Sequence, residues 1–138
     1  MTLRTTVSVV LIALLAVVTQ GRAQSQRDIE RRSCAAYQAA EKELGDVYAA
    51  VLARYAQDKA FVAKLKRAQQ AWLAYRDAEL AALYPSQDKQ ADYGSMYETC
   101  YCSEQRQMTE QRTEVLKQWL TGVEEGNVCA GSRRAADL

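Results

Sequence analysis

Apolar residues recur every three or four positions from Ser25 to about Tyr55. This spacing places them on one face of an α-helix. The segment therefore predicts one long amphipathic helix, with Gly45 as a weak point on its polar side. The apolar stripe consists of Ile29, Ala36, Tyr37, Ala40, Leu44, Val47, Tyr48, Val51, Leu52 and Tyr55.

A second stripe begins after Gln57-Asp58-Lys59, which interrupts the pattern. Asp58 is a suitable N-cap for a second helix. Pro85 is expected to end this helix, because proline disfavours helical backbone in the preceding residue and has no N–H group. The predicted core face consists of Phe61, Leu65, Ala68, Trp72, Arg76, Glu79, Leu80 and Leu83.

Residues 85–94 are polar and predict the one sizeable loop. Ser95 and Glu98 then have the spacing of a capping box, which predicts the start of a third helix. Gly122 and Gly126 are expected to fray its end, and residues 126–138 are expected to be disordered apart from Cys129. The stripe of this helix consists of Tyr97, Tyr101, Met108, Arg112, Val115, Leu116, Trp119 and Val123.

Three helices with short connections predict an all-α fold, a small antiparallel three-helix (up-down-up) bundle. This topology brings the start of the first helix, with Cys34, beside Cys100 and Cys102. Those two cysteines point about 200° apart on a helix. We therefore predict that one of them bonds Cys34 and that Cys129 folds back to bond the other. Zinc is disfavoured, because the chain has no histidine and the Cys-x-Cys spacing has no matching second pair.

Residues 1–23 have the pattern of a signal peptide. Arg4 is followed by an apolar run over 7–18 and by the small residues Gly21 and Ala23. The run is shorter than the roughly 20 residues that span a bilayer. We therefore expect cleavage near Ala23 and a periplasmic or secreted product without a stable membrane span. That product would comprise a helical domain over 24–125 and a tail over 126–138, stapled by disulfides in an oxidising compartment.

Charge and composition exclude several classes of function. Without Arg4 and Arg22, Lys and Arg fall from 18 to 16 against 17 Asp and Glu, so the net charge is −1. Basic and acidic residues alternate, which argues against a nucleic-acid partner. Without histidine, a Ser-His or Cys-His dyad cannot form, and a slim bundle offers no sugar cleft between two carboxylates. We therefore expect no enzymatic activity, no cofactor and no metal.

The segment from Gln69 to Glu79 holds the candidate site. Gln69, Trp72, Arg76 and Glu79 share one helical face, which mixes an aromatic ring with an amide, a cation and an anion. Such a mixture indicates charges that are partly covered and hydrogen-bonded, either as a structural polar cluster, which we favour, or as a partner site. We expect Arg76 to reach Glu79, and Arg112 to meet Glu79 or Asp77. The predicted cluster consists of Gln69, Trp72, Tyr75, Arg76, Asp77, Glu79, Thr109 and Arg112.

The same segment carries a family resemblance. The pattern A-Q-x-A-W-L-x-Y-R-D-A-E over 68–79, followed by Gly94-Ser95-Met96 and by Thr109-x-x-Arg112-x-x-x-Leu116, resembles the LprI-type lysozyme inhibitors over Cys34 to Leu120. Many relatives have a cysteine where this chain has Leu80, so their disulfide scheme is not carried over. The resemblance implies an exported protein that blocks lysozyme by occupying its substrate cleft.

For partner binding we select Asp88, Asp92 and Tyr93, because loops carry recognition and acidic groups suit a cationic enzyme. An ordinary solvated loop has the same composition.

Two further readings stay open beside inhibition. The competing class is a cell-envelope structural or protein-binding module that docks through its tyrosines. A third is a small chaperone-like factor with an exposed apolar face. The tyrosines in question are Tyr37, Tyr48, Tyr55, Tyr75 and Tyr84.

Overall fold

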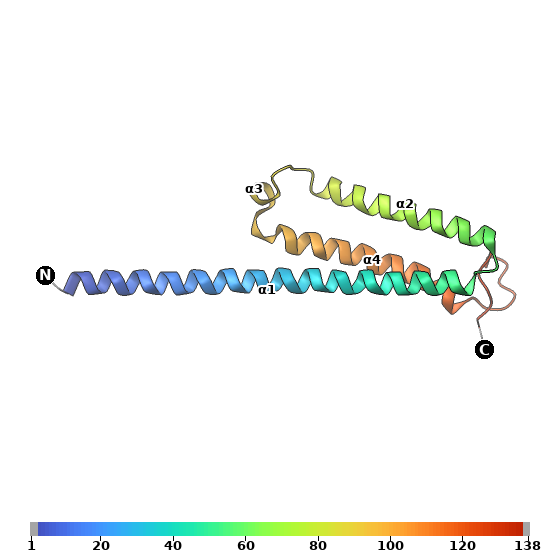
Figure 1. Cartoon of the computed structure of the whole chain (residues 1–138), viewed down its shortest axis with the longest axis horizontal. Helices are drawn as coiled ribbons and strands as arrows, with labels where there is room; N and C mark the ends of the chain where they lie inside the picture. The colour runs from blue at the N-terminus through green and yellow to red at the C-terminus, as the bar shows by residue number, and fades with distance from the viewer. Residues whose placement is uncertain (1–2, 137–138) are drawn as a thin grey trace.

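The computed structural model describes residues 3–136, with side chains from residue 24 onward. Its long helices are α1 (Leu3–Arg54), α2 (Lys59–Leu83) and α4 (Tyr97–Thr121), and a short helix α3 (Lys89–Tyr93) and a 3-10 turn (Gly94–Met96) lie between α2 and α4. The chain runs along α1, returns along α2 and runs forward again along α4 (Figure 1). The predicted all-α, up-down-up bundle is confirmed. The side chains of the predicted signal peptide, residues 1–23, lie outside the described part of the chain.

The ends of α2 follow the local signals in the sequence. Asp58 is the N-cap, and its carboxylate accepts a hydrogen bond of 2.9 Å from the Phe61 N–H. The helix ends at Leu83, two residues before Pro85. Among the described residues, no helix is both long enough and apolar enough to cross a membrane.

The core lies mainly between α1 and α4, which pack closely along each other, whereas α2 touches α4 at fewer places. Leu44, Val51, Tyr55, Leu65 and Leu116 form one buried cluster. Further buried side chains are Ala40, Leu80, Cys102, Thr109 and Thr113.

The predicted core faces are wrong at several positions. Leu83 is 50% exposed and Val115 is 47% exposed, and Ala68 and Glu79 are exposed as well. The reason is that α2 lies apart from α4 over part of its length. Thr109 and Thr113 are buried instead of the neighbouring apolar positions. The Thr113 hydroxyl donates a hydrogen bond of 2.9 Å to the Thr109 carbonyl, which allows it to be buried inside a helix interface.

The connection between α2 and α4, residues 84–96, is more ordered than the predicted loop, and we call it the tip. Asp88 caps α3 by accepting a hydrogen bond of 2.9 Å from the Ala91 N–H. The predicted capping box at Ser95 and Glu98 is wrong. α4 begins at Tyr97, and no side chain in the described chain caps it, because Gly94, with φ at +71°, leads into a 3-10 turn that already contains Ser95.

The disulfide between Cys34 and Cys102 joins α1 to α4. This confirms that one cysteine of the Cys100/Cys102 pair bonds Cys34. The predicted second bridge is wrong, since Cys100 and Cys129 are exposed free thiols. Cys100 lies in the first turns of α4, whereas Cys129 lies in the segment beyond its far end, and the helix between them is about 30 Å long.

The described part of the segment after α4, up to residue 136, folds back on the bundle, in contrast to the disorder predicted for residues 126–138. Val123 and Ala135 form an isolated parallel bridge, with hydrogen bonds of 3.0 Å from the Val123 N–H to the Arg134 carbonyl and 2.9 Å from the Ala136 N–H to the Val123 carbonyl. A Cβ atom on Gly122, whose φ is +78°, would lie 2.7 Å from the Ala136 nitrogen. Glycine is therefore required where the chain turns back.

Two arginines fasten this returning segment to the end of the bundle. The Arg134 N–H donates a hydrogen bond of 3.1 Å to the Tyr55 hydroxyl. The guanidinium groups of Arg133 and Arg134 lie 5.6 Å and 4.7 Å from the ring centroids of Trp119 and Tyr55, respectively. Cation–π contacts of this kind stabilise by about 0.5–1 kcal/mol each when exposed.

Candidate functional site

Arg76 connects α2 to α1. Its side chain is only 12% exposed. Its Nε and Nη2 atoms donate hydrogen bonds of 3.1 Å and 3.0 Å to one Asp77 carboxylate oxygen. Its Nη1 atom donates to Glu41 at 3.3 Å and to the Tyr37 hydroxyl at 3.4 Å. The predicted pair with Glu79 is wrong, because Arg76 turns toward α1 and Glu79 turns toward α4.

The electrostatics of this group fit a structural role. Burial raises the pKa of Tyr37, and the hydrogen bond to Glu41 raises it further. Burial alone would lower the pKa of Arg76, but the hydrogen bond to Asp77 and the neighbouring negative charges outweigh it, so the pKa is raised. Tyr37 therefore remains a neutral donor and Arg76 a cation at neutral pH. Arg76 also lies over the Trp72 ring, 5.4 Å from its centroid.

Replacing Arg76 with alanine is expected to lower the free energy of unfolding by about 1–2 kcal/mol. The effect is limited because Asp77 and Glu41 are 67% and 46% exposed, so water screens both ion pairs. Thermal unfolding followed by circular dichroism measures it. Arg106→Ala, which removes an exposed pair with Glu110 on α4, is the control and should change stability by less than about 0.5 kcal/mol. An unchanged melting temperature for Arg76→Ala would contradict the structural role and favour a binding role.

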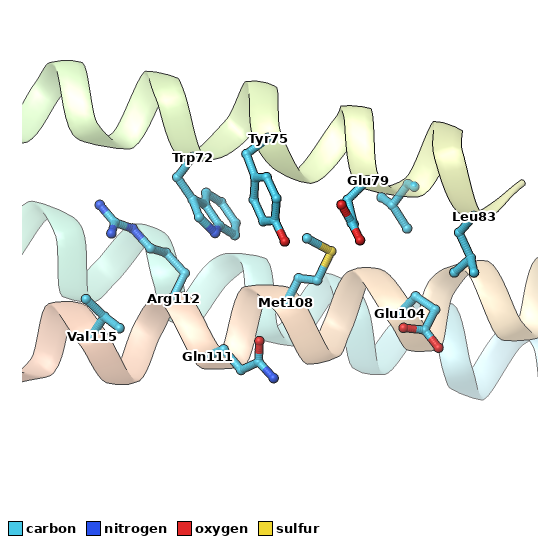
Figure 2. Close-up of a pocket in the computed structure, with 10 residues that line it drawn as sticks. Trp72, Tyr75, Glu79, Leu83, Glu104, Met108, Gln111, Arg112 and Val115 are labelled. Atoms are coloured by element: carbon cyan, nitrogen blue, oxygen red, sulfur yellow. The ribbon is translucent and has the colours of Figure 1, made fainter. Parts of the chain in front are cut away.

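A groove of about 460 Å³ lies between α2 and α4. Trp72 and Tyr75 project from α2 toward Met108 on α4, and α1 passes behind the two helices (Figure 2). Tyr75 is 56% exposed and lies on this open side. The residues that line the groove are Trp72, Tyr75, Glu79, Leu80, Leu83, Glu104, Met108, Gln111, Arg112 and Val115.

The groove carries opposite charges at its two ends. Arg112 lies at one end, and its Nε atom donates a hydrogen bond of 3.0 Å to Gln69. Burial lowers the pKa of Arg112, since no carboxylate in the described chain pairs with it. Glu79 and Glu104 lie toward the other end (Figure 2), and neither forms an ion pair within the described chain. The predicted contact of Arg112 with Glu79 or Asp77 is therefore wrong.

The predicted polar cluster is thus divided among three places. Arg76 faces α1 and bonds the exposed Asp77, and Thr109 is fully buried. Tyr75, Glu79 and Arg112 line the groove, where Gln69 holds Arg112, and Trp72 contacts both regions. Sequence reasoning missed Glu104 and Gln111 as groove residues and placed Met108 and Val115 in the core. The available signal was that Glu104, Met108, Arg112 and Val115 share one face of α4.

The residues chosen in the tip also have bonds within it. Asp88 caps α3, and Asp92 accepts a hydrogen bond from the Ser86 hydroxyl. The Tyr93 hydroxyl accepts a hydrogen bond of 3.1 Å from the Ser86 N–H, and its ring packs against Tyr84 with centroids 5.2 Å apart. Both aspartates remain exposed, whereas Tyr93 is half-buried. α3 stands at the end of the α2–α4 hairpin (Figure 1).

Comparison with protein families identifies a relationship for this chain. A family model described as lysozyme inhibitor LprI matches residues 18–116, which include all of α2, the tip and the groove-lining part of α4. No curated protein and no solved structure matches the chain. Among the described residues, no group of three or more His, Cys, Asp or Glu side chains is placed to hold a metal ion.

Proposed function

The chain belongs to the LprI lysozyme inhibitor family, and from this premise we propose that it is an exported, non-enzymatic protein that inhibits lysozyme by occluding the substrate cleft of the enzyme. The family match over residues 18–116 is the observation that carries this proposal. Export to the periplasm or the medium, after cleavage near Ala23, is part of it. The competing reading, a general envelope-binding module, has no comparable observation in its support.

We assign the inhibitory contact to the tip. A cleft is entered by a protruding element, and the tip stands at the end of the hairpin with the exposed carboxylates of Asp88 and Asp92. The cap of α3 and the packing of Tyr93 against Tyr84 and Tyr97, with ring centroids 5.2 Å and 6.0 Å apart, fix its shape before binding. Such preorganisation reduces the entropy lost on binding. The carboxylates complement a cationic enzyme and favour association at low salt.

The purified protein is expected to slow the lysis of bacterial cell walls by lysozyme. Inhibition should rise with concentration to saturation, because each bound inhibitor closes one substrate cleft. A panel of lysozymes of different classes, assayed by the turbidity of cell-wall suspensions, measures the effect and its selectivity. Absence of inhibition at a large molar excess over every enzyme would overturn the proposed function.

A pair of variants locates the contact. Asp88→Asn combined with Asp92→Asn removes both charges but keeps the oxygens that accept the internal hydrogen bonds, and asparagine still caps a helix. We expect about tenfold weaker inhibition, equivalent to about 1.4 kcal/mol. Glu124→Gln combined with Glu125→Gln removes two exposed charges beyond the far end of α4 and should leave inhibition unchanged. If both double variants inhibit like the unmodified protein, the tip is not the contact, although the inhibitor assignment itself would stand.

A further inference from the structure

The groove face of the α2–α4 hairpin exposes apolar side chains. Tyr75, Leu83 and Val115 line the groove and are 56%, 50% and 47% exposed, respectively. Met108 lies between the two helices in the same groove (Figure 2). An apolar surface that is gathered in one place and bordered by charges is typical of an interface between proteins.

The charged residues on this face form no ion pairs within the described chain, whereas other charged residues of α4 do. Arg106 pairs with Glu110, and Lys117 pairs with Glu114 and Glu43, all within the described chain. Arg112 and Glu104 line the groove and have no ion pair in that part of the molecule. One end of the groove is therefore positive and the other negative. A surface of this kind is complementary to a reversed copy of itself.

The spacing along α4 makes this complementarity specific. Glu104, Met108 and Arg112 follow one another at intervals of four residues, about 6 Å each along the helix axis. A two-fold axis that crosses the groove at Met108 and lies in the plane of the face therefore brings Arg112 opposite Glu104 of a second copy. The same axis brings Glu104 opposite Arg112 of that copy, so both contacts are formed at once.

The same operation also matches the other helix. Tyr75 and Glu79 lie one turn apart on α2, on either side of Met108 (Figure 2). This axis places α2 opposite α2 of the second copy, with the two helices running in opposite directions. The Tyr75 hydroxyl therefore comes opposite the Glu79 carboxylate of the second copy and can donate a hydrogen bond to it. An axis parallel to the helices and running along the groove would instead place α4 opposite α2 of the second copy, and it would bring Glu104 near Glu79 of that copy, since both lie toward the same end of the groove. Like charges in contact are unfavourable, so the crossing axis is selected.

We propose that two copies of this chain associate through the groove face as a symmetric antiparallel dimer, with Arg112 of each copy paired with Glu104 of the other. The two α2–α4 hairpins then form a four-helix arrangement, in which the side chains of one copy fill the groove of the other. Tyr75, Leu83 and Val115 become buried, and the half-buried guanidinium of Arg112 gains an anion. The tips lie at opposite ends of the dimer, so each remains accessible.

Sedimentation velocity of the purified exported protein tests the association. Cys34–Cys102 is kept intact, and the free thiols of Cys100 and Cys129 are alkylated so that a covalent dimer cannot form. We expect twice the monomer mass at micromolar concentration. A monomer mass at every concentration up to about 1 mM, where association would contribute less than about 4 kcal/mol, would overturn the proposal.

Exchange of the charges tests the geometry. Arg112→Glu and Glu104→Arg each place like charges at both contacts and should raise the dissociation constant at least tenfold. An equal mixture of the two variants restores opposite charges at both contacts, and so does the double variant alone, so both should dimerise again. Arg106→Glu changes a charge of α4 outside the groove and should leave the dimer unchanged. A dimer that either single variant leaves intact, or that the mixture fails to restore, would overturn the arrangement.

Arg112 also bonds Gln69, so replacing Arg112 removes that hydrogen bond and could disturb folding. The double variant controls for this effect, because it lacks the same hydrogen bond and is still expected to dimerise. Glu104→Arg leaves that bond in place and tests the contact independently. Lysis assays with the monomeric variants separate the two proposals. Inhibition is expected to persist in them, since the tip lies outside the groove.

Discussion

Replacing Cys34 and Cys102 together with alanine is expected to lower the free energy of unfolding by about 4 kcal/mol. The bond links residues 68 positions apart and joins α1 to α4, the two helices that share most of the core. Its main effect is to restrict the unfolded chain, and this restriction increases with the length of the closed loop. Urea unfolding followed by circular dichroism measures the change as a lower midpoint concentration.

The matched control keeps this disulfide and removes the other two sulfurs. Cys100→Ser and Cys129→Ser alter exposed thiols that form no bond. We expect their combined effect to stay within about 0.5 kcal/mol. If loss of Cys34 and Cys102 lowered the free energy of unfolding by less than about 1 kcal/mol, the disulfide would not be what holds α1 against α4, and the packing of the core would account for their association.

The elements that local signals define could be predicted from the sequence. Asp58 and Pro85 limit α2 because capping and the loss of an N–H act within a few residues. The part of the chain that bonds Cys34 could also be predicted, since short connections fix which helix ends are neighbours. The course of the chain after Gly122 did not follow, because it depends on Arg133 and Arg134 packing on Trp119 and Tyr55, contacts that have no periodic pattern.

Only part of the candidate site could be predicted, because tertiary packing decides how its residues are divided between the neighbouring helices. The residues on α2 were identified because an aromatic ring beside charges on one helical face is unusual. Their division was not foreseeable, since Arg76 turns toward Glu41 on α1 while Tyr75 and Glu79 turn toward α4. The distance between α2 and α4 is set by tertiary packing, and it decides whether Val115 is core or groove. Periodicity gives the face of a helix, whereas the closeness of its neighbour is a property of the whole molecule.

Leu116→Ala is expected to lower the free energy of unfolding by about 3 kcal/mol. Leu116 is 0% exposed and packs in the buried cluster with Leu44, Val51 and Tyr55. Because the rigid helices around it cannot close over the missing atoms, the loss of transfer free energy is accompanied by a cavity. Urea unfolding of the variant, with the disulfide intact, measures the effect at a protein concentration below that at which copies associate.

The adjacent residue provides the contrast that separates core from interface. Val115 is 47% exposed and lines the groove, so Val115→Ala should destabilise the isolated chain by less than about 1 kcal/mol. The same substitution removes apolar area from the proposed dimer face and should weaken association, whereas Leu116→Ala should weaken it only as far as the chain unfolds. One residue step along α4, a rotation of about 100°, thus divides a position that holds α1 and α4 together from one that meets a second copy. Equal losses of folding stability for the two variants would show that α2 closes over Val115 and that the groove is filled in solution.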